Sequence, residues 1–177
     1  GAKRMKNLIN DLLAYSKVDL QPAQQGAAEC NKVLKQAMDN LQPAIASSGA
    51  KIEAGKLPVV DADPCQLLQV FQNLISNAIK FRDQQPRIEI FAERKADQWV
   101  FAFSDNGIGI PAEHHERIME IFKRLHSRSK YPGTGIGLSI CKRIIERHGG
   151  KLWLQSEQDK GTTFYFSLPD KDGNDKI

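Results

Sequence analysis

Three glycines crowd the start of a predicted helix in the segment YPGTGIGLSICKRIIERHGG, residues 131–150. Gly133, Gly135 and Gly137 each cost conformational entropy on folding, so a chain keeps them mainly where bare backbone approaches another group closely. The first N–H groups of a helix have no partner inside it and attract anions, phosphate above all. The segment therefore indicates either a flexible turn or a phosphate site at a helix N-terminus.

The familiar nucleotide-binding motifs do not describe this segment. GTGIGL carries leucine where the dinucleotide fingerprint has its third glycine, and the chain contains no G-x-x-x-x-G-K-[ST] motif. The H-R-D and D-F-G motifs of protein kinases are absent from the sequence as well. A phosphate site here would therefore belong to another class of nucleotide-binding protein.

A second predicted helix, residues 64–81, carries an unexpected polar row. Asp63 is a good N-cap, and the proline after it suits the first helical position. Asn73, Asn77 and Lys80 are spaced i, i+4 and i+7, so they share one face opposite the apolar side. Amide oxygen is a hard ligand suited to Mg²⁺, and lysine supplies a point charge to phosphates. The alternative is a merely solvated polar face.

The motif DNGIGIP, residues 105–111, follows a predicted strand. Asp105 could accept a hydrogen bond from a donor such as the amino group of adenine. Gly107 and Gly109 would let a base or a neighbouring backbone come close. The alternative is an ordinary strand-ending turn with an Asx hydrogen bond.

The order of the elements predicts an α+β fold, a sandwich in which helices cover one face of a mixed, mostly antiparallel sheet. An amphipathic helix precedes it, with Met5, Leu8, Ile9, Leu12, Leu13, Tyr15 and Val18 on one stripe. The predicted elements are a helix over 3–19, a linker with a first short strand over 21–30, a helix from Asn31 as N-cap to about Ser48, strands 51–54 and 58–62, the helix 64–81, a hairpin of strands 87–95 and 98–106, a helix ending at Arg147, strands 151–157 and 162–169, and a disordered tail over 170–177.

Composition limits the function. At 177 residues with 41% hydrophobic content the chain can bury a real core. The three cysteines lack metal-binding spacing, and there is neither an apolar run of 18 residues nor a signal-peptide pattern, so we expect a cytoplasmic protein without membrane contact from this segment. The net charge of the chain is a modest +4. The clearest group of basic residues lies just before the glycines and fits an anionic ligand better than nucleic acid; it consists of Lys123, Arg124, Arg128 and Lys130.

Taken in order, NLISNAIKF, DNGIGIP, EIFKRLH and GTGIGLSI resemble the N, G1, F and G2 boxes of sensor histidine kinases. Residues 31–169 resemble the ATP-binding catalytic domain of that family, and FRDQQPRIEI resembles its phytochrome-like branch. Leu125 stands where many sensor kinases carry a second aromatic residue in the F box. The resemblance implies ATP and Mg²⁺ as cofactors.

The resemblance also implies roles for particular residues. Asn77 would bind Mg²⁺, with Asn73 and Lys80 as catalytic residues serving the phosphates, while Asp105 would bind the adenine amino group. Residues 111–132 would form a mobile lid over the nucleotide. The remaining implied contacts are Gly107 and Gly109 at the base, Gly133, Thr134, Gly135, Gly137 and Leu138 in the phosphate-side wall, and Thr163 (or its neighbour Thr162) behind the adenine.

In the hydrolases that share this fold, a glutamate that activates water lies one helical turn before the metal-binding asparagine. Here that position is Asn73, an amide that cannot act as a general base. The resemblance therefore implies transfer of the γ-phosphoryl group to a histidine rather than hydrolysis. The alternative is a nucleotide-binding regulatory or scaffold module without transfer activity.

The four histidines, at 114, 115, 126 and 148, lack the acceptor context of a long helix with a following acidic residue. Residues 1–20 instead resemble the second helix of the dimerisation hairpin, whose first helix carries the acceptor. A single such helix is marginal alone, so we expect it to pack on a neighbour or to fray. The implied partners are the hairpin of the same kinase, as a homodimer, and the receiver domain of a response regulator, with no nucleic acid.

Overall fold

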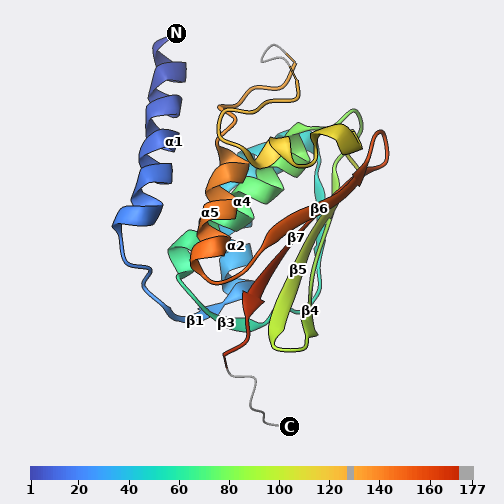
Figure 1. Cartoon of the computed structure of the whole chain (residues 1–177). Coiled ribbons are helices and arrows are strands. Elements are labelled where there is room, and N and C mark those ends of the chain that lie inside the picture. The colour runs from blue at the N-terminus through green and yellow to red at the C-terminus, as the bar shows by residue number, and fades with distance from the viewer. Residues whose placement is uncertain (127–129, 172–177) are drawn as a thin grey trace.

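The structure, a computed structural model, describes residues 1–126 and 130–171 and combines helices with a twisted sheet (Figure 1). In chain order the elements are α1 (Ala2–Leu20), β1 (Gly26–Glu29), α2 (Cys30–Asn40), α3 (Gln42–Ser48), β2 (Lys51–Ala54), β3 (Val59–Ala62), α4 (Pro64–Lys80), β4 (Arg87–Lys95), β5 (Gln98–Asp105), the 3-10 helices η1 (Ala112–His114) and η2 (Arg117–Met119), α5 (Gly137–Arg147), β6 (Leu152–Glu157) and β7 (Gly161–Pro169).

The central sheet has five strands in the order β2-β4-β5-β7-β6. β2 runs parallel to β4, and every other neighbouring pair is antiparallel, so the predicted mixed, mostly antiparallel sheet is confirmed. The predicted hairpin of β4 and β5 is confirmed as well, with Lys95 opposite Gln98. A separate two-stranded ribbon joins β1 to β3.

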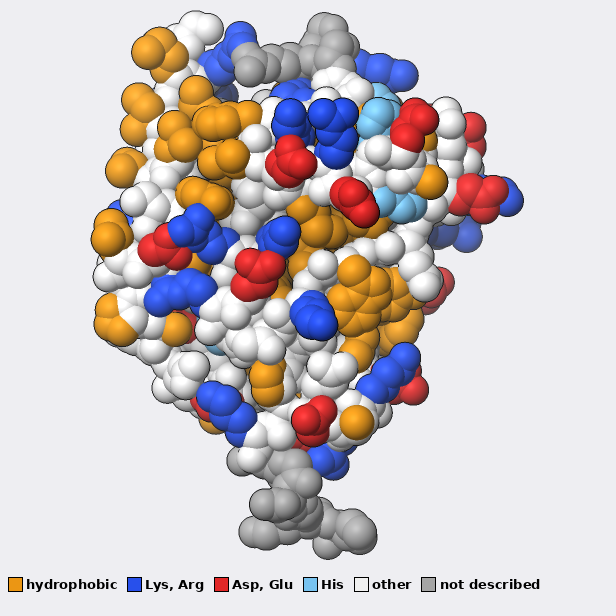
Figure 2. Space-filling view, viewed as in Figure 1, with side chains coloured by type: hydrophobic (Ala, Val, Ile, Leu, Met, Phe, Trp, Pro, Cys, Tyr) orange, Lys and Arg blue, Asp and Glu red, His pale blue; other side chains and the backbone are white. Residues whose placement is uncertain are grey.

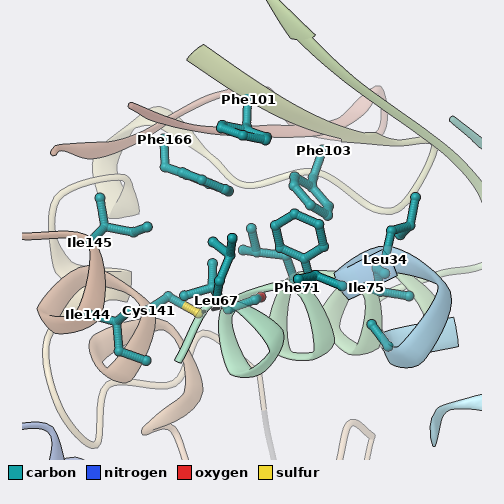
Figure 3. Packing of buried hydrophobic residues seen from close by; sticks show 14 of the residues in the cluster. Leu34, Leu67, Phe71, Ile75, Phe101, Phe103, Cys141, Ile144, Ile145 and Phe166 are labelled. Carbon is teal, nitrogen blue, oxygen red and sulfur yellow. Dashed lines mark hydrogen bonds between the residues drawn. The ribbon is translucent and has the colours of Figure 1, made fainter. Parts of the chain in front are cut away.

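Helices α2, α4 and α5 cover one face of the sheet, with α4 between the other two (Figure 1). The core lies between these layers (Figure 3). Phe71 of α4 meets Phe103 edge to face, with ring centroids 5.1 Å apart, and Phe101 stacks on Phe166 at 4.7 Å. Aromatic pairs in these geometries add attraction beyond the area they bury. The predicted α+β sandwich is therefore confirmed, and its core fixes the position of α4 over the sheet.

Two local predictions are wrong. The single helix expected from residue 31 to 48 is broken at Leu41, because Pro43 has no N–H to continue the hydrogen bonds of α2 and instead lies in the first turn of α3. Asn31 is not the N-cap of α2, since it lies inside the helix. Its side chain instead donates to the Leu57 carbonyl and accepts from the Leu57 N–H, at 3.2 and 3.1 Å.

The helix α1 packs beside α5, as one of the two expected outcomes for it (Figure 1). Val18 is buried, and the Arg143 guanidinium of α5 lies 4.5 Å from the ring centre of Tyr15. Arg143 also forms an ion pair with Asp19. Leu8 is half-buried against the core, but much of the apolar surface of α1 stays exposed, as Figure 2 shows; the exposed apolar residues of α1 are Met5, Ile9, Leu12, Leu13 and Leu20.

The disorder predicted over 170–177 is wrong for its first two residues, which make ion pairs with the folded domain. Asp170 forms an ion pair with Arg94 at 2.8 Å, and Lys171 forms one with Asp61 at 3.0 Å. Residues 172–177, the rest of that predicted tail, lie outside the described residues. Within the described ranges, no helix combines the length and apolar character that crossing a bilayer requires.

The three cysteines are free thiols in different surroundings. Cys30 and Cys141 lie in the core, whereas Cys65 is exposed in the first turn of α4. The helix begins where it was predicted to, because the Asp63 carboxylate accepts from the N–H groups of Cys65 and Gln66 at 2.9 and 3.3 Å.

Candidate functional site

A cavity of about 500 Å³ opens between α4, the start of α5, the ends of β5 and β7 and the segment that joins β5 to α5. Residues that are far apart in the sequence meet in its wall. Most of the predicted site residues are among them: Asn73, Asn77, Lys80, Asp105, Gly109, Gly133, Thr134, Gly135, Gly137 and Leu138.

The helix α4 supplies the polar row of this wall. Asn73, Asn77 and Lys80 are each half-buried and line the cavity rather than the outer surface of the domain. The Asn73 amide donates to the carbonyl of Gly137 at 3.3 Å and so ties α4 to the start of α5. Burial lowers the pKa of Lys80, with Arg124 acting in the same direction and Asp11 opposing it. A partly desolvated ammonium of this kind is suited to an anionic ligand.

Asp105 occupies the end of β5 and faces the cavity. Its Oδ1 accepts hydrogen bonds from the N–H groups of Gly107 at 2.8 Å and Thr162 at 3.3 Å. Burial nevertheless raises the pKa of Asp105 to about 6, because desolvation outweighs these two hydrogen bonds. Both donors act on the same oxygen, so Oδ2 is left to accept from a ligand, such as the amino group of a purine.

The two glycines after Asp105 are needed for close contacts. A Cβ at Gly109 would lie 2.0 Å from the carbonyl oxygen of Glu157, and the residue has φ +70°. A Cβ at Gly107 would lie 2.3 Å from the carbonyl oxygen of Phe81. Gly107 does not itself line the cavity, so its contact with the base stays a prediction. It lets the strand end approach the C-terminus of α4.

Of the two threonines considered for the adenine end of the site, Thr162 lines the cavity and Thr163 does not, so the structure favours Thr162. Side chains alternate across a strand, so neighbours on β7 face opposite sides of the sheet. Thr162 shares its face with buried Phe164, whereas the Thr163 hydroxyl pairs with Ser104 at 2.8 Å on the other face.

The glycine-rich segment forms part of the cavity wall next to α4, with Gly133 beside Lys80 and Gly137 beside Asn73. Gly133 and Gly135 have φ +147° and +80°, which other residues rarely adopt. The Arg124 guanidinium donates to the carbonyls of Tyr131 and Gly133 and so holds the segment in place. Among the described residues, no side chain caps the N-terminus of α5, so its first N–H groups are available to an anion.

The sequence did not single out several residues of the wall. Arg124 was noted only within a basic cluster, of which Arg128 lies outside the described residues. The segment 111–132 has no regular sequence pattern, and within its described residues, 111–126 and 130–132, the regular elements are the short helices η1 and η2. The apolar part of the wall includes Ile108 and Ile110. Their alternation with glycine in DNGIGIP could have predicted that both line the cavity.

The helix α1 also reaches the cavity, which no sequence pattern indicated. Asn7, Asn10 and Asp11 line its edge. The Asp11 carboxylate accepts a hydrogen bond from the Thr134 hydroxyl at 2.6 Å. The helix α1, which lies outside the sandwich, thus holds the Thr134 hydroxyl of the glycine-rich segment.

The donor set of the cavity fits Mg²⁺. This ion takes one or two oxygens from a protein and completes its shell with phosphates and water. The Asn77 amide supplies one hard oxygen in the half-buried wall, next to the lysine that faces the same space. The arrangement offers an amide oxygen of Asn77 to a metal, the ammonium of Lys80 to phosphates and the carboxylate of Asp105 to a base.

Comparison with known proteins gives a consistent picture. Residues 62–172 match the family described as "Histidine kinase-, DNA gyrase B-, and HSP90-like ATPase". Phytochrome-like protein Cph1 of Synechocystis sp. (strain ATCC 27184 / PCC 6803 / Kazusa) is 53% identical over 170 residues, covering 96% of this chain and 23% of that protein. The chain therefore spans about a quarter of the length of this curated relative.

Solved structures share the fold. Full-length ShkA in complex with AMPPNP superposes with a TM-score of 0.79 at 25% identity, covering 92% of this chain and 35% of ShkA. The catalytic domain of histidine kinase ThkA, in a nucleotide-free form, has a TM-score of 0.72 at 28% identity and covers 83% of this chain and 96% of that domain.

Proposed function

This chain belongs to the family of histidine kinase-, DNA gyrase B- and HSP90-like ATPases, and we propose that it is the ATP-binding catalytic domain of a sensor histidine kinase. The domain binds Mg-ATP and transfers the γ-phosphoryl group to a histidine on a dimerisation hairpin. The likeness to Cph1 and to the catalytic domain of ThkA supports this branch of the family. The complex of ShkA with AMPPNP, an ATP analogue, supports the nucleotide.

The observation that carries the proposal is the hydrogen bond between Asn73 and Gly137. In the hydrolases of this fold a glutamate occupies the position of Asn73 and activates water. Here the side chain donates to a carbonyl oxygen, which an ionised carboxylate cannot do. The residue holds α4 to the start of α5 and leaves the cavity without a base at that position. A site of this kind orients ATP for an external nucleophile.

Phosphoryl transfer depends mainly on positioning and on stabilising charge. The Lys80 ammonium attracts the phosphates, and the first N–H groups of α5 donate hydrogen bonds to them at the glycine-rich segment. Asn77 holds Mg²⁺ together with the phosphates, and the bound ion neutralises their charge. Asp105 accepts from the amino group of adenine and so fixes the other end of the nucleotide.

The partners follow from the same proposal. The exposed apolar residues of α1 suit the second helix of a dimerisation hairpin, which would pair in a homodimer of the longer protein. The phosphorylated histidine would then pass its phosphoryl group to the receiver domain of a response regulator, in the cytoplasm. Transfer of labelled phosphate from ATP to a separately supplied hairpin domain tests the proposal directly.

Replacing Asp105 with alanine is expected to weaken ATP binding about 10- to 100-fold, because an unpaired buried donor costs roughly 1–3 kcal/mol. The preference for ATP over GTP should shrink with it. Calorimetric titration of both nucleotides measures the effect, and Asp83→Ala, at an exposed position outside the cavity wall, is the control. Unchanged affinities in the Asp105 variant would show that the adenine base binds at another place than Asp105.

The affinity for Mg-ATP should also depend on pH. Burial raises the pKa of Asp105 to about 6, and the adenine amino group donates a stronger hydrogen bond to the ionised carboxylate than to the neutral acid. Binding should therefore be strongest well above pH 6 and weaken as the pH drops through 6, because the carboxyl group is then protonated. Asp105→Asn cannot titrate, so it isolates this effect from protonation of the phosphates. Parallel pH profiles for the two proteins would contradict the role of Asp105.

A further inference from the structure

The hydroxyl of Ser156, on β6, lies at the centre of a small hydrogen-bond network at the edge of the cavity. Its Oγ is 2.7 Å from the backbone nitrogen of Ile110, 2.9 Å from the carbonyl oxygen of Gly161 and 2.7 Å from the Thr162 hydroxyl. These partners come from the segment after β5 and from the start of β7. None of the roles assigned above uses Ser156.

The partners of Ser156 determine where the hydroxyl protons lie. A backbone N–H can only donate, so Ser156 accepts from Ile110. A carbonyl oxygen can only accept, so Ser156 gives its single proton to Gly161. The contact between the two hydroxyls then has one solution, in which Thr162 donates its proton to Ser156.

This assignment decides what Thr162 offers to a ligand. Thr162 is buried and lines the cavity, and with its proton directed at Ser156 its oxygen can only accept. Asp105 lies beside it, with Oδ1 already engaged by the Gly107 and Thr162 N–H groups. The base end of the cavity therefore presents two acceptors, Asp105 Oδ2 and Thr162 Oγ1.

We propose that Ser156 is a positioning residue for base selectivity, because it orients the Thr162 hydroxyl so that the site accepts purines with a 6-amino group and rejects purines with a 6-oxo group. An amino group brings two protons to two acceptors. A 6-oxo group brings lone pairs and leaves a buried acceptor unpaired, which polar sites discriminate against strongly. The inference rests on the proposed binding of ATP and adds a residue that does not touch the nucleotide.

The test compares ATP with ITP, whose bases differ in carrying an amino or an oxo group at position 6. In Ser156→Ala the Thr162 hydroxyl is free to turn and donate, so the ratio of ITP to ATP dissociation constants should fall about five- to tenfold, the equivalent of one hydrogen bond. Ser104→Ala is the matched control, since it breaks the equivalent hydroxyl pair with Thr163 on the opposite face of the sheet. That variant should keep the wild-type ratio.

A double-mutant cycle separates this role from a structural one. Thr162→Val keeps the volume of the side chain and should lower the ratio by itself, and adding Ser156→Ala should change nothing further. A further fall in the double variant would show that Ser156 acts through Ile110, and it would overturn the inference. An unchanged ratio in Thr162→Val would do the same, even if Ser156→Ala failed to fold. Wild-type protein that binds neither nucleotide would instead refute the proposed function.

Discussion

Replacing Asn77 with alanine is expected to abolish the contribution of Mg²⁺ to ATP binding. Asn77 supplies the one hard side-chain oxygen proposed as a protein ligand for the metal, and it lies in the half-buried wall beside Lys80. Interactions with charged groups are worth roughly 1.5–3 kcal/mol, so the affinity for Mg-ATP should fall about 10- to 100-fold. Affinity for ATP in the presence of a chelator should change little.

Titration calorimetry with and without Mg²⁺ measures this difference. Alanine is a better helix former than asparagine, so the variant should melt no earlier than the wild type. Gln72→Ala, on the same helix but outside the cavity wall, is the control and should keep the full Mg²⁺ dependence. A variant at residue 77 that still gains affinity from Mg²⁺ would show that the ion is held by other groups.

Incubated with ATP, the chain is not expected to acquire phosphohistidine, whereas a full hairpin domain added in trans should become phosphorylated. The surroundings of His148 and His115 explain why the chain should not phosphorylate itself. His148 is buried, with Nε2 accepting from the Asp63 N–H at 3.1 Å and Nδ1 donating to the Ile144 carbonyl at 2.7 Å. Both ring nitrogens are engaged, so His148 has no lone pair for attack. His115 is bound through Nε2 to the carbonyl of Ile110 at 2.7 Å.

The other two histidines belong to the segment between β5 and α5. His114 pairs with Glu113, and the ring of His126 packs against Tyr131 with centroids 5.1 Å apart. Neither stands on a long helix that could present it to the γ-phosphate of ATP.

Acid-labile, base-stable phosphate on the added hairpin would identify the transfer. The Asn77→Ala variant should transfer almost none, which ties the reaction to the cavity. Phosphohistidine mapped by mass spectrometry to any of the four histidines of the chain would contradict the prediction. Tight ATP binding without transfer to any hairpin domain would favour the alternative of a regulatory nucleotide-binding module.

The sequence predicted the site well where a residue pattern is local. The i, i+4, i+7 row on α4 and the acidic residue at the end of β5 both follow from helix and strand periodicity, and both line the cavity. The same periodicity could have chosen between the threonines. Phe164, Phe166 and Leu168 point into the core, and counting back by twos places Thr162 on their face.

Other features depend on contacts that no local pattern encodes. Asn31 has the sequence signature of an N-cap, yet its amide pairs with the backbone of Leu57, which only the folded chain brings near. Arg124 holds the glycine-rich segment from a region without periodicity. The hydrogen bond between Asp11 and Thr134 joins residues 123 positions apart. Tertiary packing decided each of these.

The placement of the three cysteines makes the unmodified chain suitable for labelling with a single fluorescent dye. Alkylating reagents attack the thiolate, and burial raises the pKa of Cys30 and of Cys141 to about 12, so neither reacts at neutral pH. Cys65 is exposed in the first turn of α4. With a rise of 1.5 Å per residue, it stands about 18 Å along the helix from Asn77. A maleimide dye there reports on the helix that carries the polar row and leaves the cavity clear.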